Sequence, residues 1–144
     1  MCRPSTPIWL LKHNTLMATV LVAVFVISSC TGLSKDERFQ RDCDEFTEKY
    51  CPKREDRCQV LDSITYDKPT RSIHKWFSVG GELDSADIYT EKVIYSMRES
   101  LLENLTNSLS LKRYKDEGVT FVYHYASSTT RKEYFSVTLT KEDY

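Results

Sequence analysis

The 144-residue chain is poor in glycine and proline, with four of each, and its charges nearly cancel, since 20 Lys and Arg residues stand against 21 Asp and Glu residues. So little Gly and Pro excludes a collagen-like or low-complexity chain, and a near-neutral charge removes the electrostatic basis for binding nucleic acid. The length accommodates one ordinary domain.

Motifs that carry known chemistry are also missing. The chain contains no G-x-S-x-G, no Gly-rich phosphate-binding loop, no H-E-x-x-H and no Cys pair at zinc-binding spacing. His74 and His124 lie on predicted strands, at positions opposite in parity to the core residues, as ordinary strand histidines do. Either could be drawn into a catalytic arrangement with Asp62 or Cys58, which makes a hydrolase of unknown class the alternative. We expect no enzymatic activity, no cofactor and no metal site.

The longest apolar run is short. Leu16 to Ile27 is a stretch of 12 residues without a charge, and residues 1–29 contain no Asp or Glu. A membrane-spanning helix needs roughly 20 apolar residues, so this run does not span a bilayer alone. It fits the apolar segment of a signal peptide, about 7–15 residues long, and Lys12 and His13 flank it on the amino-terminal side. We therefore predict a signal peptide over residues 1–29.

The apolar run ends in Ile27-Ser28-Ser29-Cys30. This segment resembles the lipobox of bacterial lipoproteins, in which an aliphatic residue and two small residues precede the cysteine; Ile at the first position, where Leu is commoner, is the one departure. The resemblance covers residues 1–30 and implies cleavage before Cys30 and a diacylglyceryl group on its thiol. Two or three acyl chains hold a protein stably on a membrane, whereas one binds reversibly. The alternative is a cysteine that follows an ordinary signal peptide or an uncleaved anchor.

Ser34-Lys35-Asp36-Glu37 follows a short tether at residues 30–33. It is similar to the acidic export signals of small Bacteroidota surface lipoproteins, although it lies further from the cysteine than those do. The same residues fit a capping box, in which Ser34 and Glu37 open a helix. Both interpretations stay open. Together with the lipobox they predict a lipoprotein of the cell envelope, anchored in the outer membrane by its acyl chains and facing either the periplasm or the surface.

Residues 34–144 are predicted to form one small α+β domain with the element order αββαββ. Apolar residues at helical spacing predict a helix over 34–50 and a long amphipathic helix from Asp87 or Thr90 to Leu109. Alternation and turn residues predict strands over 59–66, 72–79, 119–126 and 133–140. We expect a four-stranded antiparallel sheet with the long helix packed on one face, and in addition a shorter amino-terminal helix.

Three cysteines remain besides Cys2 and Cys30, an odd number for an oxidising compartment. On a continuous helix Cys43 and Cys51 would lie about 12 Å apart, beyond the roughly 7 Å that a disulfide allows between Cα atoms. We predict a Cys51–Cys58 disulfide that closes the loop over Pro52. A Cys43–Cys58 disulfide and three free thiols are the alternatives.

The sheet face turned away from the long helix is the candidate interaction surface. If Phe121, Tyr123 and Tyr125 point at that helix, the other face carries an aromatic row: His74, Trp76, Val122, His124 and Tyr134. An exposed row of this kind binds a glycan, a peptide or a partner protein. The alternative is that the amino-terminal helix covers it. We therefore expect a non-catalytic interaction module with an envelope protein as partner; the alternative function is a binder of a small ligand or glycan.

Overall fold

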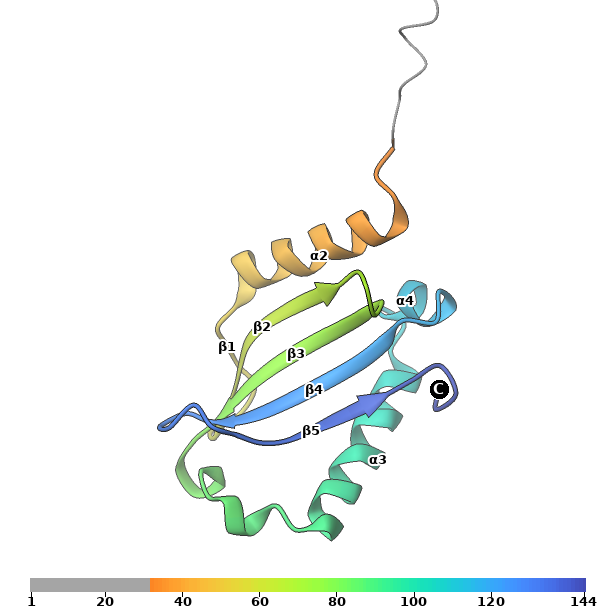
Figure 1. Ribbon diagram of the computed structural model, residues 1–144. Helices are drawn as coiled ribbons and strands as arrows, with labels where there is room; N and C mark the ends of the chain where they lie inside the picture. The colour runs from red at the N-terminus through yellow and green to blue at the C-terminus, as the bar shows by residue number, and fades with distance from the viewer. Residues whose placement is uncertain (1–31) are drawn as a thin grey trace, which may run out of the picture. The chain divides into compact units, whose positions relative to one another are not determined.

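The computed structural model describes residues 32–144 and contains the six expected elements with additions. In chain order the elements are α2 (Lys35–Tyr50), β1 (Lys53–Arg54), β2 (Gln59–Asp67), β3 (Ser72–Val79), the 3-10 turns η1 (Gly81–Leu83) and η2 (Ala86–Ile88), α3 (Glu91–Asn107), α4 (Lys112–Asp116), β4 (Thr120–Ser127) and β5 (Glu133–Leu139) (Figure 1). The predicted signal peptide and the lipobox residues Ile27, Ser28, Ser29 and Cys30 lie outside the described residues.

The sheet has the strand order β1-β2-β3-β4-β5, with β3 and β4 parallel and the other pairs antiparallel. The α+β class is as predicted, but a four-stranded, fully antiparallel sheet is wrong in both respects. The chain leaves β3, passes through α3 and α4, and returns to the start of β3, so that Ser72 pairs with Thr120. A long crossover of this kind is what parallel pairing requires. The added strand β1 has two residues, too few for alternation to reveal.

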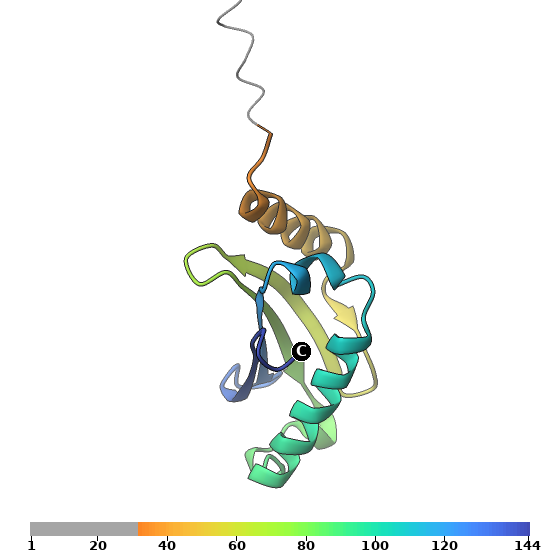
Figure 2. The ribbon, with the colours of Figure 1, turned by 90° about the vertical axis from the view of Figure 1, so that its right-hand side faces the viewer.

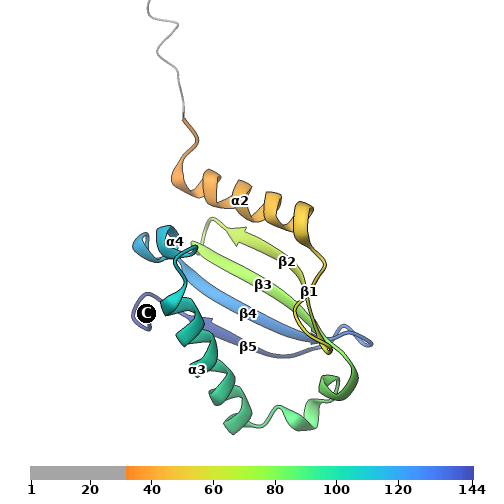
Figure 3. The ribbon, with the colours of Figure 1, turned by 180° about the vertical axis from the view of Figure 1, so that it is seen from behind.

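Helix α2 begins with the predicted capping box. The Ser34 hydroxyl accepts a hydrogen bond from the Glu37 N–H at 3.2 Å, and the Glu37 carboxylate accepts one from the Ser34 N–H at 2.8 Å. The helix runs along β2 (Figures 1 and 3), where the Thr47 hydroxyl donates to the Ile64 carbonyl and accepts from its N–H, each at 2.8 Å. Helix α2 therefore satisfies backbone groups of β2 beyond the short pairing with β1.

The core lies on the face of the sheet that α3 and α4 cover (Figures 2 and 3). Along β4 every second side chain is buried, and Phe121, Tyr123 and Tyr125 all point to this side. Residues 33–144 form one compact unit around this core. Helix α3 packs loosely on the sheet, because Leu105 is the one residue of α3 that is fully buried. No helix of residues 32–144 has the length and apolar content to cross a bilayer.

The cysteines do not pair as predicted. Cys43, Cys51 and Cys58 are free thiols, so the predicted Cys51–Cys58 disulfide is absent. Strand β1 explains why: Lys53 pairs with Leu61 and Arg54 with Val60, so the turn after β1 brings Cys58 back beside Asp56, whose carboxylate accepts a hydrogen bond from the Cys58 N–H at 2.7 Å. Cys51 lies before β1, at the end of α2.

Candidate binding face

The face of the sheet opposite α3, here called the open face, gathers four of the five residues predicted for it. The strand register places His74 beside Val122 and Trp76 beside His124, in the two central strands. Trp76 keeps 39% of its surface exposed. Within residues 32–144 no helix lies over these residues (Figure 1). The alternative that the amino-terminal helix covers them does not describe this structure, because the buried residues of α2, Phe39 and Cys43, belong to the core on the other side.

Tyr134 does not join the row. The pairing of β4 with β5 shifts between Tyr125 and Ala126, and this bulge takes Tyr134 out of alternation. Its hydroxyl donates to Asp84 at 2.8 Å, and its ring lies 5.2 Å from that of Tyr89. Tyr134 therefore ties β5 to the loop between η1 and η2.

Three rings on the open face lie nearly parallel. The centroids of Trp76 and His124 are 3.9 Å apart with an interplanar angle of 8°, and those of His74 and His124 are 5.2 Å apart at 13°. The Trp76 indole N–H donates to the Thr65 hydroxyl at 3.1 Å. The indole is thus held at its edge and against one ring, so binding would cost little side-chain entropy.

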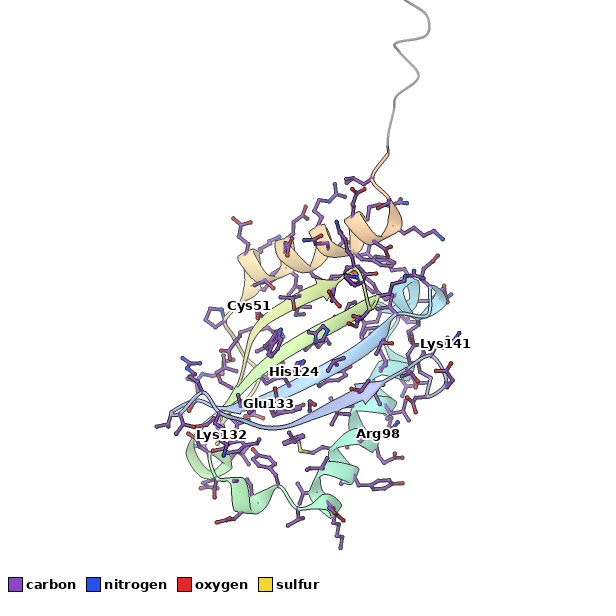
Figure 4. All side chains as sticks on the ribbon, in the orientation of Figure 1. Cys51, Arg98, His124, Lys132, Glu133 and Lys141 are labelled. Atoms are coloured by element: carbon purple, nitrogen blue, oxygen red, sulfur yellow. The ribbon has the colours of Figure 1, made fainter. Side chains whose placement is uncertain are left out.

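A chain of hydrogen bonds crosses the same face, from the β2–β3 turn to the start of β5. Asp67 accepts from Thr70, and Thr70 and Ser72 are joined at 2.6 Å. Ser72 contacts His74 Nε2 at 2.8 Å, and His74 Nδ1 contacts His124 Nε2 at 2.9 Å. The chain ends at Glu133, whose carboxylate lies 3.0 Å from His124 Nδ1; Figure 4 shows His124 and Glu133 on this face.

The groups along this chain differ in whether they donate or accept. Both ends are carboxylates, which only accept hydrogen bonds, while the two hydroxyls and two neutral imidazoles supply four protons for five contacts. Burial, and then the proximity of His124, lowers the pKa of His74. The surroundings of His74 therefore favour its neutral form.

The hydrogen bonds of this face engage the residues that the sequence offered for catalysis. Each of the four ring nitrogens of His74 and His124 already has a protein partner. Asp62, which the sequence allowed as a catalytic partner, accepts a hydrogen bond from Ser78 instead. No group of three or more His, Cys, Asp or Glu side chains between residues 32 and 144 is arranged to hold a metal ion.

Several residues that make contacts on the open face were not predicted from the sequence. Thr65 and Ser72 have the parity of the open face, since they alternate with Ile64, Tyr66 and Ile73. That signal was available from the alternation of β2 and β3. Glu133 had no such signal, because a bulge lies between it and the regular part of β5.

Comparison with known proteins identifies a family and two solved structures of similar fold. A family model described as "Domain of unknown function (DUF8479)" matches residues 34–135. No curated protein matches the sequence. The crystal structure of a candidate secreted protein from Pseudomonas aeruginosa is similar over 78% of this chain and 98% of its own, with a TM-score of 0.61 and 12% identity. A pilotin from the type 2 secretion system of Vibrio vulnificus, EpsS, is similar over 75% and 89%, with a TM-score of 0.56 and 9% identity. At these identities the likeness concerns the fold.

Proposed function

We propose that this chain, which belongs to the family described as Domain of unknown function (DUF8479), is a lipid-anchored protein of the cell envelope. In this proposal it binds another envelope protein and has no catalytic activity. The observation that carries this proposal is the exposed indole of Trp76, held flat against His124 on an uncovered sheet face. Aromatic side chains that are already ordered are typical centres of protein interfaces.

The anchor would be the acyl groups on Cys30, which the lipobox resemblance implies. The tether at residues 30–33 would then join the domain to the outer membrane. The two solved structures of similar fold support an envelope location, because one is described as a secreted protein and the other as a pilotin of a secretion system. That pilotin is described as part of a type 2 secretion system, which supports an envelope protein as the partner here.

The absence of catalysis is supported by the chemistry of the histidines. A general base needs an imidazole nitrogen with a free lone pair within reach of its substrate. On the open face the nitrogens of His74 and His124 are engaged with Ser72, with each other and with Glu133. Hydrolysis would require that chain to open first.

A photo-crosslinking amino acid at position 76 tests the proposed surface in native envelopes. We expect one envelope protein to be crosslinked from position 76, and the Trp76→Ser variant to lose that same protein in a pull-down. Tyr95, an aromatic residue on α3 that is 65% exposed, supplies the matched control. Crosslinks of equal yield from positions 76 and 95, or full retention of the partner by Trp76→Ser, would contradict the open face as the binding surface.

A glycan is the second candidate ligand, and the flat indole is the observation that favours it. Sugar rings pack on aromatic faces, and the hydroxyls of Ser136 and Thr138, paired with His124 and Val122 across the sheet, lie on the same face as the indole. Envelope oligosaccharides that quench the fluorescence of Trp76, and that compete with the crosslink, would favour this function over a protein partner.

A further inference from the structure

Lys75 occupies a position that a core residue would normally take. In β3 it shares its parity with Ile73 and Phe77, and in the sheet it lies between Ile64 and Tyr123. Its side chain therefore points to the helix-covered side, opposite to that of Trp76. A charge that is largely removed from water is unfavourable unless it is paired.

The ammonium of Lys75 has no such partner within residues 32–144. It makes no ion pair and donates no hydrogen bond there, and its one specific contact is the ring of Tyr123, with Nζ 5.3 Å from the centroid. Burial lowers the pKa of Lys75 accordingly. The sequence held a signal for this residue, namely a lysine in the middle of a core-facing alternation.

A cavity of about 420 Å³ opens in front of Lys75, between α2, β1, the sheet and the α3–α4 connection. Five charged side chains line it, and four of them neutralise one another: Arg113 pairs with Asp42 at 2.6 Å and Lys53 with Glu55 at 2.9 Å. The remaining charge is that of Lys75. Most of the other lining is apolar: Phe46, Leu61, Ile64, Ile73, Leu111 and Tyr114. A second hollow of about 320 Å³ extends from it toward α3 and shares Lys75.

We propose that this cavity binds an aliphatic carboxylate of the fatty-acid type, with the carboxylate at Lys75 and the hydrocarbon chain along the apolar walls. The charge complementarity is specific, because one unpaired ammonium among apolar residues matches one carboxylate on an apolar body. A cavity of this volume lies within the range of about 300–1,000 Å³ that small-molecule sites occupy.

The size of the cavity favours a hydrocarbon chain over a peptide. One turn of α-helix with its side chains is about 10 Å wide and 5.4 Å long, so a single turn already takes up about 400 Å³. An extended peptide would bring backbone N–H and C=O groups that apolar walls leave unpaired. A hydrocarbon chain is slimmer and has no such groups. This site is on the opposite side of the sheet from the open face, and the proposal does not depend on the function proposed above.

The test uses hexadecanoate, labelled with ¹³C at its carboxyl carbon, and the fragment 33–144, which contains the whole core. Far-UV and near-UV circular dichroism first establish that each variant is folded. We expect a 1:1 complex in calorimetry below the critical micelle concentration, and a carboxyl signal that stays ionised to lower pH when bound than when free. Lys75→Met keeps an apolar side chain of similar length and is expected to weaken hexadecanoate binding at least tenfold.

Two controls separate the carboxylate contact from general hydrophobic binding. Hexadecanol lacks the carboxylate, so Lys75→Met should bind it as well as the wild type does. Lys132→Met changes an exposed lysine in the β4–β5 turn and should leave hexadecanoate binding unchanged. Equal affinity of wild type and Lys75→Met for hexadecanoate would overturn the proposal. It would also fall if hexadecanoate fails to bind, or if a one-glutamate amphipathic peptide binds in its place.

Discussion

The neutral form of His74 gives the sharpest prediction about the open face. Its two ring nitrogens contact Ser72 at 2.8 Å and His124 at 2.9 Å. We expect His74 to stay mostly neutral at pH 6.5, the ordinary midpoint of an imidazole, because burial, followed by the proximity of His124, lowers the pKa of His74.

The repulsion between two charged imidazole rings determines how strongly the doubly protonated pair is disfavoured. With centroids 5.2 Å apart, two imidazolium charges repel by about 3 kcal/mol at an effective dielectric constant of about 20. The doubly charged pair is therefore disfavoured by a factor on the order of one hundred. In addition, its two N–H groups would face each other across the 2.9 Å that now separates His74 Nδ1 from His124 Nε2. A second proton must open this contact.

Nitrogen-detected NMR of the imidazoles measures the charge of His74 at each pH. His124→Gln is the informative variant, because it removes the neighbouring imidazole whose proximity lowers the pKa of His74. We expect His74 to become charged at higher pH in this variant than in the wild type, whereas Glu142→Gln, an exposed control, should match the wild type.

The lowered pKa of His74 also predicts how the free energy of unfolding depends on pH. The folded-state pKa of His74 lies below its ordinary value of 6.5, so its neutral form contributes full stability above about pH 6.5 and progressively less as the pH falls below that value. A His74 that is half-charged at pH 6.5 or above, or one whose midpoint is the same in His124→Gln as in the wild type, would refute this reasoning.

Four further predictions concern the anchor, the surface, the core and the cysteines. Cys30→Ala should abolish labelling of the protein with radioactive palmitate; labelling that persists would contradict the lipobox. Trp76→Ala should cost about 1–2 kcal/mol in urea unfolding, less than the ~3–5 kcal/mol of a fully buried aromatic, because the indole is 39% exposed; a cost in the buried range would remove it from the surface. Leu105→Ala should cost about 2–5 kcal/mol, since this side chain is 1% exposed, and a cost below 1 kcal/mol would show that α3 is not packed on the sheet. Nonreducing peptide mapping should recover Cys51 and Cys58 unbridged, and a Cys51–Cys58 peptide would mean that β1 does not pair with β2 in the register seen.

Local patterns in the sequence were sufficient for most of the elements. The capping box at Ser34 and Glu37 predicted the start of α2, because both hydrogen bonds are made within four residues. The alternation around Phe121 predicted which side of β4 is buried, because side chains of a strand point to opposite faces in turn. The same alternation placed His74, Trp76 and His124 on one face before their contacts were known.

The direction of β4 was decided by the tertiary structure alone. A sequence pattern is the same whether a strand runs parallel or antiparallel to its neighbour, and only the path of the crossover through α3 and α4 selects the parallel pairing. That pairing brings His124 beside Trp76 and His74 although 50 residues separate the two histidines in the chain. The position of Tyr134 could not be predicted from the sequence either, since the bulge that moves it depends on the partner strand.

What the sequence determined by itself is local: roughly where elements begin and end, and which side of each strand is apolar. The tertiary structure decided which side chains meet. It joined two ordinary-looking histidines into one chain with Asp67 and Glu133, kept Cys51 apart from Cys58, and left the ammonium of Lys75 without an ion pair in a cavity whose other charges are paired. The physical reason is that charge pairing, hydrogen bonding and cavity volume depend on distances between segments remote in the chain, which no local pattern encodes.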